Sequence, residues 1–295
     1  MKYLSVAETS KKWGISERSV RNYCEQNRVS GAFLTGKTWN IPENALKPIR
    51  KEGKLFSDNL LLNILKEQKD VKLKGGIYHK IQIEFSYNSN HIEGSKLSVD
   101  QTRMIFETQT LSADKNVNVN DIIETSNHFK CVDYIIENAK KPLTQNLIKE
   151  LHFILKSGTS DSRLDWFKVG DYKLLPNEVA GMITSEPKNV KNEMQNLIDK
   201  YNKIERKTLE DIVAFHKEFE SIHPFQDGNG RVGRLIMFKE CLNNNITPFI
   251  IDEEHKIFYY RGLKEWANER GFLIETCASC QDKFKSYLNY FKICY

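Results

Sequence analysis

The residues from His223 to Arg234 read HPFQDGNGRVGR, and their types suit the binding of phosphate groups. Within twelve residues they supply an imidazole, a carboxylate, a Gly-Asn-Gly turn and two guanidinium groups. An imidazole can accept a proton near neutral pH, and arginines bind phosphate oxygens through paired hydrogen bonds. A single carboxylate beside phosphates is a typical ligand of Mg²⁺. The stretch therefore contains the groups needed for transfer onto a phosphorus atom.

Two predicted helices flank this stretch and position it. Residues 208–222 carry apolar side chains at near-helical spacing, and Pro224 cannot continue a helix. Residues 232–242 are largely apolar and predict a second helix. The turn at residues 227–230 would therefore lie at a helix N-terminus, where unpaired N–H groups and the helix dipole favour an anion.

The side chains around the turn fit the same interpretation. Gly228 and Gly230 have no side chain, so the backbone on both sides of Asn229 can approach a phosphate closely. Arg231 and Arg234 are three residues apart and would project from one face of the second helix toward that anion. A polar helix-loop-helix corner explains any one of these residues more simply, but their combination in this order favours a nucleotide site.

The stretch resembles the signature of the Fic family, His-Pro-Phe-x-Asp/Glu-Gly-Asn-Gly/Ala-Arg, which often continues to a second Arg. Every position of that pattern is filled here. Members are mostly protein adenylyltransferases, which move AMP from ATP onto a Ser, Thr or Tyr hydroxyl of a target protein. The resemblance implies that His223 is the general base, that Phe225 anchors the loop, and that Asp227 holds the Mg²⁺ that bridges the α- and β-phosphates.

The same resemblance assigns the remaining residues of the signature to phosphate binding. It implies that Gly228, Asn229 and Gly230 form the anion cradle. It also implies that Arg231 and Arg234 bind the β- and γ-phosphates. The related Doc branch, which transfers a phosphate, carries Lys at the position of Gly230, so this glycine favours AMP transfer.

A second motif lies upstream, in residues 80–94, where a predicted helix ends at Gly94. Ser89, Glu93 and Gly94 are similar to the inhibitory motif of the family, Ser/Thr-x-x-x-Glu-Gly/Asn. The resemblance is to the subclass whose inhibitory helix precedes the core, and it implies that Glu93 pairs with Arg234 and displaces the γ-phosphate. Such a charge-assisted pair is strong, so ATP would have to compete for the arginine. In some relatives this Glu positions a water that removes AMP, which leaves de-AMPylation as an alternative.

Residues 174–183 have a hairpin-like pattern within an otherwise helical region. They resemble the family's flap, which pairs with the target segment that bears the hydroxyl, although members often have Arg at the position of Lys173. Tyr260, on a tail helix predicted over residues 253–269, would flank the adenine. We expect the target to dock against three flap residues: Val179, Met182 and Ile183.

Length and composition limit the class of protein. A chain of 295 residues with 40% hydrophobic residues is expected to form about two soluble domains. It has no run of eighteen apolar residues and a polar start, so we expect neither a membrane span nor a signal peptide. The six scattered cysteines predict reduced thiols in a cytoplasmic protein, and the lone CxxC at Cys277 and Cys280 predicts packing rather than zinc binding. Three further histidines within predicted helices are expected to be structural: His128, His152 and His216.

Positive charge is concentrated at the N-terminus. Residues 1–51 contain ten basic and four acidic residues, a net charge of +6, whereas the whole chain carries +5. Such an excess is expected for a module that contacts an anionic polymer. Ser5 and Glu8 predict a capping box before a short helix, and Ser16 is the predicted cap of a second helix over residues 17–26.

A hairpin with a Gly-Lys turn is predicted over residues 32–42 and is a candidate wing. The outline resembles the winged helix-turn-helix modules of excisionases and MerR-type regulators. That resemblance implies that Arg18, Arg21 and Asn22 contact a DNA major groove and that Lys37 contacts flanking phosphates. A helical module that docks a protein is the alternative.

The sequence as a whole predicts a mainly α protein in three parts. Residues 1–50 are the winged helix-turn-helix module, residues 51–76 a linker helix capped by Ser57, and residues 77–295 a Fic-type helical bundle with a β-hairpin flap. We expect Mg²⁺-dependent AMP transfer from ATP to a hydroxyl of a target protein or of the chain itself, restrained by Glu93. The alternative is a DNA-binding transcriptional regulator whose Fic half senses nucleotide. The sequence leaves homo-oligomerisation open.

Overall fold

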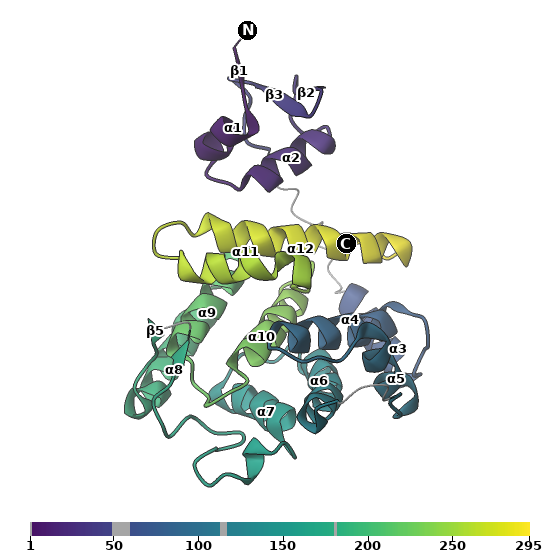
Figure 1. The fold of residues 1–295 in the computed structure, drawn as a ribbon, viewed down its shortest axis with the longest axis vertical. Coiled ribbons are helices and arrows are strands. Elements are labelled where there is room, and N and C mark those ends of the chain that lie inside the picture. The colour runs from purple at the N-terminus through teal and green to yellow at the C-terminus, as the bar shows by residue number, and fades with distance from the viewer. Residues whose placement is uncertain (1, 49–59, 113–116, 180–181) are drawn as a thin grey trace.

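The computed structural model describes residues 2–48, 60–112, 117–179 and 182–295, and these residues are mainly helical (Figure 1). The predicted cap Ser57 and much of the predicted linker lie outside the described residues. Among the described residues, no helix has both the length and the hydropathy needed to cross a membrane.

A small N-terminal unit comes first. Helix α1 (Val6–Trp13) and helix α2 (Glu17–Glu25) pack beside three short strands, β1 (Tyr3–Leu4), β2 (Phe33–Thr35) and β3 (Thr38–Pro42). The strands are antiparallel in the order β1-β3-β2. Ser5 and Glu8 form the predicted capping box, Ser16 caps α2, and Gly14 turns the chain between the helices at φ 64°. Strand β1 was missed because two residues carry no readable period.

The larger unit is a bundle of ten helices among the described residues: α3 (Leu60–Asp70), α4 (Ile77–Ile92), α5 (Val99–Thr108), α6 (Val119–Glu137), α7 (Gln145–Lys156), α8 (Pro187–Asn202), α9 (Leu209–Ile222), α10 (Asn229–Asn243), α11 (Glu253–Lys264) and α12 (Gly271–Tyr290). A 3₁₀ turn, η1 (Asp161–Arg163), and the antiparallel strands β4 (Glu178–Val179) and β5 (Met182–Ile183) complete it. In β4 and β5, Glu178 lies opposite Ile183 and Val179 opposite Met182.

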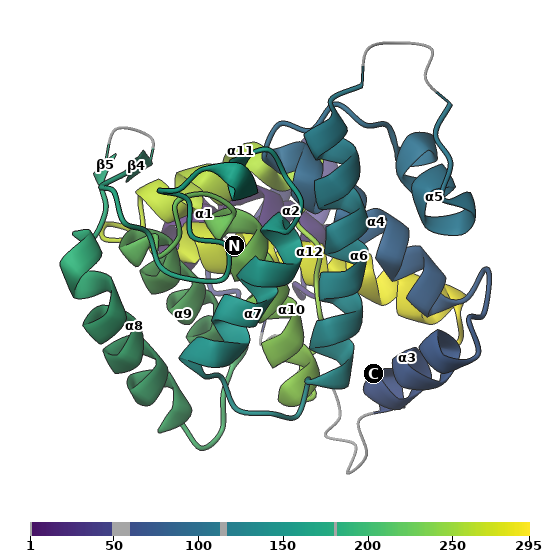
Figure 2. The ribbon, with the colours of Figure 1, turned by 90° about the horizontal axis from the view of Figure 1, so that it is seen from below.

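Helix α10 forms the centre of this bundle. Nearly every residue from Asn229 to Leu242 is buried, as expected for a helix enclosed on all sides. It packs against α4, α6, α7 and α9, and Figure 2 shows it between α9 and α6. Because α10 begins directly after the loop at residues 223–228, the loop is joined directly to this buried helix.

Local capping explains most of the helix boundaries. The sequence predicts that Thr144 caps a helix over residues 145–156, and this is confirmed in α7. It also predicts Asn120 as the cap of a helix over residues 121–139, which was wrong, because Asn118 accepts the Asn120 N–H and α6 begins at Val119. The tail helix predicted to reach residue 269 ends at Lys264. Both cysteines of the CxxC are buried on α12 and form no disulfide.

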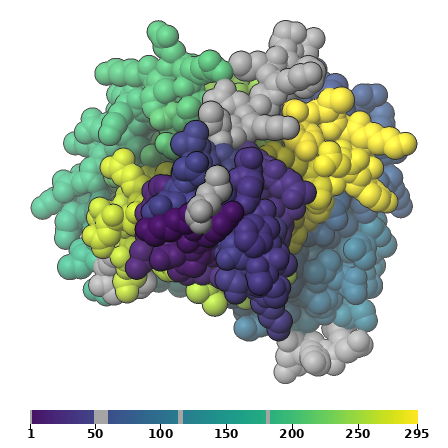
Figure 3. Space-filling model, turned by 90° about the horizontal axis from the view of Figure 1, so that it is seen from above, coloured from purple at the N-terminus to yellow at the C-terminus, as the bar shows by residue number. Residues whose placement is uncertain are grey.

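The two units have separate cores and meet at one junction. The small core contains Val20 and Ile41 and shares no residue with the core of the bundle. A cavity of about 370 Å³ lies between α2 and the tail helices α11 and α12. Figure 3 views the molecule from the N-terminal side of this junction. At one edge the contact is direct, because a Cβ built on Gly271 would lie 2.9 Å from the carbonyl oxygen of Gly14.

Candidate active site

The loop that joins α9 to α10 begins with a backbone conformation that is unusual for a histidine. His223 caps the C-terminus of α9 at φ 50° and ψ 62°, and its N–H donates to the Phe219 carbonyl at 2.9 Å. A non-glycine residue at positive φ is uncommon and is often found at functional sites. Pro224 then prevents the helix from continuing. The chain therefore leaves α9 at His223 and enters the loop that leads to α10.

Asn229 holds this loop closed from inside. Its side-chain amide accepts from the Phe225 N–H and donates to the Phe225 carbonyl, both at 2.8 Å. Phe225 is fully buried and stacks on His152, with ring centroids 4.0 Å apart and planes 5° apart. His152 also bonds the Asp227 carbonyl and accepts the Gly170 N–H. The side chain of Asn229 therefore braces the loop, and only backbone groups remain for an anion.

The first turn of α10 has the features of an anion site. Gly228 caps it at φ 83°, and no side chain caps its first N–H groups. Such a terminus carries partial positive charge. Gly230 follows in the first turn, where a Cβ would overlap the carboxylate of Glu93. The Glu93 carboxylate thus lies beside the first turn of α10, whose N–H groups could donate to an anion.

Glu93, the C-cap of α4, is bound directly to Arg234. The guanidinium donates to Glu93 Oε1 at 2.7 Å, and the arginine side chain is only 2% exposed. Ser89 fixes the same arginine, since its hydroxyl accepts at 3.0 Å and its carbonyl at 2.9 Å. Gly94 ends α4 at φ 102°. The three residues predicted to form the inhibitory motif and the second arginine are therefore brought together.

Arg231 and Asp227 belong to a charged network that the sequence analysis did not predict. Arg231 is buried and bonds both Glu124 and, at 3.2 Å, Asp227. Lys156, which is 2% exposed, donates to Asp227 at 2.6 Å and also pairs with Glu124. Although partial burial raises the pKa of Asp227, the Arg231 and Lys156 charges outweigh it and lower that pKa well below its usual value. The Asp227 carboxylate is therefore ionised, and the Arg231 guanidinium donates to Asp227 and Glu124.

The electrostatic setting of His223 keeps its imidazole neutral. Burial lowers the pKa of His223 to about 4, and the charge of Lys173 lowers it in the same direction. Lys173 itself lies at the base of the flap, where it donates to Asn177, Thr184 and the Ile222 carbonyl. A neutral imidazole at pH 7 is the form that can accept a proton.

The predicted flap residues lie on one antiparallel strand pair beside the loop. Its base is tied to the signature by the Lys173 N–H, which donates to the Pro224 carbonyl at 2.9 Å, and by Asn177, which donates to the Phe225 carbonyl at 3.0 Å. Val179 pairs with Met182, and Ile183 is 82% exposed. An exposed Ile at the edge of a two-stranded sheet leaves room for another strand.

Tyr260 lies near the end of α4, where Glu93 is the C-cap. Its hydroxyl donates to the Ile92 carbonyl at 3.5 Å, at the end of α4. The neighbouring Tyr259 is buried, and the Arg234 guanidinium lies 6.0 Å from its ring centroid. Helix α11 thus contacts both Arg234 and the end of α4, the two groups beside Glu93.

The candidate DNA contacts are not all on a free surface. Lys37 is exposed in the turn between β2 and β3, and Asn22 is half-buried. Arg18 and Arg21 are exposed but line the cavity against α11 and α12, together with Phe258, Arg261 and Glu275. Both arginines are therefore exposed, as expected for the outer face of α2, and the nearness of the tail helices across the cavity could not be read from the sequence of α2.

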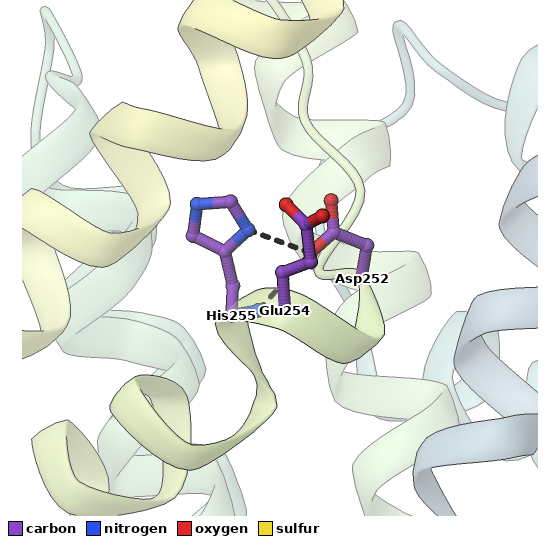
Figure 4. A group of neighbouring side chains, drawn as sticks. All are labelled: Asp252, Glu254 and His255. Carbon is purple, nitrogen blue, oxygen red and sulfur yellow. Dashed lines mark hydrogen bonds and ion pairs between the residues drawn. The ribbon is translucent and has the colours of Figure 1, made fainter.

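A second polar group, Asp252, Glu254 and His255, brings three potential metal ligands together at the start of α11 (Figure 4). Asp252 is the N-cap of α11, accepts from His255 at 2.6 Å, and pairs with Lys283 at 2.6 Å. His255 also bonds Ser279 on α12. These contacts join α11 to α12, so the group is explained as a structural brace.

Residues 142–241 match the family model described as Fic/DOC family. This segment contains α7, the flap, α8, α9 and most of α10, and thus the whole loop that carries His223. The fold and the site therefore support a Fic-family protein.

Curated relatives carry a more specific name. The protein adenylyltransferase Fic of Aedes aegypti is 27% identical over 207 residues, which is 68% of this chain and 40% of the relative. That of Drosophila melanogaster is 29% identical over 203 residues, which is 67% of this chain and 40% of the relative. The chain therefore spans about two fifths of the length of these relatives.

Solved structures support the same fold. A Fic domain containing signaling protein from Bacteroides thetaiotaomicron has a TM-score of 0.58 and 28% identity, and the match covers 80% of this chain and 92% of that one. Fic-1 from C. elegans has a TM-score of 0.60 and 18% identity, with 79% and 72% covered. At that lower identity the second likeness concerns the fold alone.

Proposed function

We propose that this chain transfers AMP from ATP to a hydroxyl group of a protein, including its own, and that Glu93 holds it in a restrained state. The observation that carries the proposal is the position of the Glu93 carboxylate. It lies between Arg234 and Gly230, beside the uncapped first turn of α10, and so takes the place that a phosphate would take. A site that binds a carboxylate in this way suits the terminal phosphate of ATP.

In this proposal His223 accepts the proton of the target hydroxyl. The oxygen forms a bond to the α-phosphorus, the bond from that phosphorus to the β-bridging oxygen breaks, and pyrophosphate leaves. His223 suits this role because its neutral form predominates and its ring is held at the loop by the C-cap of α9. Arg234 would bind the terminal phosphate once Glu93 withdraws, and the α10 terminus would stabilise charge on the phosphates.

The donor set fits Mg²⁺. Asp227 is ionised and its side chain is 50% exposed. Lys156 and Arg231 both contact Oδ2, and the Gly228 N–H also bonds this carboxylate, so these cation contacts leave Oδ1 without a charged side-chain partner among the described residues. Mg²⁺ commonly takes one carboxylate and shares phosphate oxygens and water, and when bound it would neutralise phosphate charge. Asp227 is the residue that would hold it, and the network around Lys156 would fix that carboxylate in place.

The test is labelling of the protein with α-labelled ATP and Mg²⁺. We expect the Glu93→Gly variant to label itself and proteins of a host lysate, the parent to do so slowly, and the Glu93→Gly, His223→Ala double variant to do so not at all. Removing a general base typically lowers the rate by about 10²- to 10⁴-fold. Equal labelling by the double variant and Glu93→Gly would disprove the assignment of His223. The same samples, loaded with AMP and incubated without ATP, would report de-AMPylation if Glu93 supports the reverse reaction.

We also propose that the N-terminal unit binds DNA. The excess of positive charge in residues 1–51, the α1–turn–α2 arrangement and the exposed Lys37 in the β2–β3 turn support this role. Electrophoretic shifts over a salt series test it, because phosphate contacts make affinity fall steeply with salt. Absence of a shift, or a shift that does not respond to salt, would favour a protein dock instead. DNA binding with no labelling by any variant would favour a regulator that senses nucleotide.

A further inference from the structure

Three polar side chains follow one face of α9 and end at His223. His216, Glu220 and His223 are spaced four and three residues apart, which places them in one row along a helix. The row faces α10 at Gly233. A Cβ built on Gly233 would lie 2.6 Å from His216 Nδ1 and 2.9 Å from Glu220 Oε1. The two helices approach this closely only because residue 233 has no side chain, and the approach brings the histidine and the carboxyl to the same point.

Glu220 is an acid without an arginine or lysine partner among the described residues. Its side chain is 13% exposed, and its Oε1 is buried with no hydrogen-bond partner in the described part of the chain. The nearest basic atom recorded for it is His223 Nδ1, 3.8 Å from Oε2. A buried carboxyl in this position avoids the cost of desolvation by keeping its proton. Burial accordingly raises the pKa of Glu220 to about 8, and the negative charge of Glu93 raises it in the same direction.

Two other buried nitrogens beside this carboxyl, Nδ1 of His216 and Nδ1 of His223, have no hydrogen bond of good geometry among the described residues. The backbone of Gly233 near His216 and that of Glu220 near His223 make weaker contacts, which oppose the lowering of each pKa by burial. The other ring nitrogen of His216 bonds the Tyr259 hydroxyl at 2.7 Å. His223 retains 15% side-chain exposure although its Nδ1 is buried, so its exposed edge lies on the side away from Nδ1. One protonated carboxyl can satisfy both nitrogens, because its hydroxyl oxygen donates and its carbonyl oxygen accepts.

We propose that Glu220 is a positioning residue for His223, acting as a neutral carboxylic acid that links the two histidines. Oε2 accepts the Nδ1–H of His223, which fixes the tautomer whose Nε2 lone pair is free toward the site. The Oε1 hydroxyl donates to Nδ1 of His216, and the Nε2–H of His216 donates to Tyr259. The 3.8 Å separation closes to a hydrogen bond when the site is loaded, as such bonds commonly do.

The groups that face Glu220 explain why this link belongs to the active state. Glu93 on α4 and Arg234 on α10 lie in its field, as do Tyr259 on α11 and the two histidines on α9 itself. Lys173, at the flap base, acts on His223. When Glu93 withdraws from Arg234, Oε2 of the neutral Glu220 carboxyl still accepts the Nδ1–H of the imidazolium that forms after His223 has accepted the target proton.

The inference rests on the proposed function for its kinetic consequence, but its geometric part is tested separately. Side-chain ¹⁵N NMR of the full chain reports the tautomer of His223 with no substrate present. We expect the parent and Glu220→Gln to show the Nδ1–H form, because glutamine keeps an accepting oxygen and a donor. Glu220→Ala should show a mixture of tautomers. Glu218→Gln, an exposed position on the same helix, is the matched control.

The kinetic arm uses the Glu93→Gly background and labelled ATP. We expect Glu220→Ala to lower kcat by about 10- to 100-fold with little change in the KM for ATP, since a misplaced base costs of this order. Glu220→Gln should retain kcat within about threefold, which a purely charged role would not allow. Near-parental tautomer and kcat in Glu220→Ala, or equal loss in Glu220→Gln and Glu220→Ala with intact circular dichroism, would overturn the proposal. If no variant transfers AMP while the tautomer still depends on Glu220, the proposed function fails and the positioning role stands.

Discussion

Replacement of Glu93 by glutamine tests the restraint with the smallest change of shape. Glutamine keeps the length of the side chain and loses its charge. Arg234 stays in place in this variant because Ser89 holds it through two hydrogen bonds that do not involve Glu93. We therefore expect the variant to weaken competition for the phosphate position without dismantling the pocket.

The size of the effect follows from the contact between Glu93 and Arg234. The two groups are 2.7 Å apart, with side chains 30% and 2% exposed, so this is a charge-assisted hydrogen bond in a mostly buried setting. Such bonds contribute about 1.5–3 kcal/mol, and neutral ones about 0.5–1.5 kcal/mol. At about 1.4 kcal/mol per tenfold, Glu93→Gln should strengthen ATP binding about fivefold to tenfold and Glu93→Gly about 10- to 150-fold. We therefore expect the affinity for ATP to rise in the order parent, Glu93→Gln, Glu93→Gly.

Two measurements check this order. Calorimetric titration with a non-hydrolysable ATP analogue and Mg²⁺ gives the affinity, and initial labelling with ATP gives the rate. Glu84→Gln is the matched control, because Glu84 lies on the same helix and pairs with Lys80 on the protein surface. Parental affinity and rate in both Glu93 variants would refute the reasoning, since the carboxylate would then occupy no position that ATP needs.

Further predictions concern the network, the base and the junction. Lys156→Met leaves Glu124 and Asp227 without their buried cation. It should lower the free energy of unfolding by about 3–5 kcal/mol in urea titrations. A loss below about 1 kcal/mol would contradict a structural role for the network. Because burial lowers the pKa of His223 from 6.5 to about 4, the acidic limb of kcat/KM in the Glu93→Gly variant should have its midpoint near pH 4, and a midpoint near 6.5 would contradict the buried setting. In the same protein, the contribution of neutral His223 to the free energy of unfolding is fully present above pH 6.5. It is lost as the pH falls from 6.5 to about 4, because over this range the unfolded chain binds a proton at His223 and the folded chain does not. Gly271→Ala places a Cβ against the Gly14 carbonyl, and such an overlap typically costs about 1–3 kcal/mol. The substitution should therefore expose α2 and raise the affinity for duplex DNA about fivefold or more, measured by fluorescence anisotropy. Asn268→Ala, at an exposed position, is the control.

Local sequence signals predicted the helices well where a cap and a period coincide. Thr144 before α7 and the Ser5–Glu8 box before α1 are contacts within a few residues, so their outcome depends little on the rest of the chain. The loop at residues 223–228 was predictable for the same reason, because Pro224 and the glycines restrict the backbone directly. Asn118 and Asn120 could not be separated, since both are good caps and only the start of α6 decides between them.

Contacts between distant segments were not predictable in this way. Lys156 and Glu124 are ordinary charged residues at the ends of separate helices, and their roles arise only when α6 and α7 bring them to Asp227. Glu220 did carry a signal, because its spacing from His216 and His223 places all three on one helical face. Its closeness to α10 depends on Gly233, whose effect is visible only once the two helices are packed.

Helix α11 has two opposed sets of contacts. Tyr259 and Tyr260 lie toward Arg234 and the end of α4, whereas Phe258 and Arg261 line the cavity beneath α2. Both sets sit within the width of a single helix, about 10 Å. If a ligand of the N-terminal unit and the proposed nucleotide each favour a particular setting of α11, each changes the affinity for the other by the same factor.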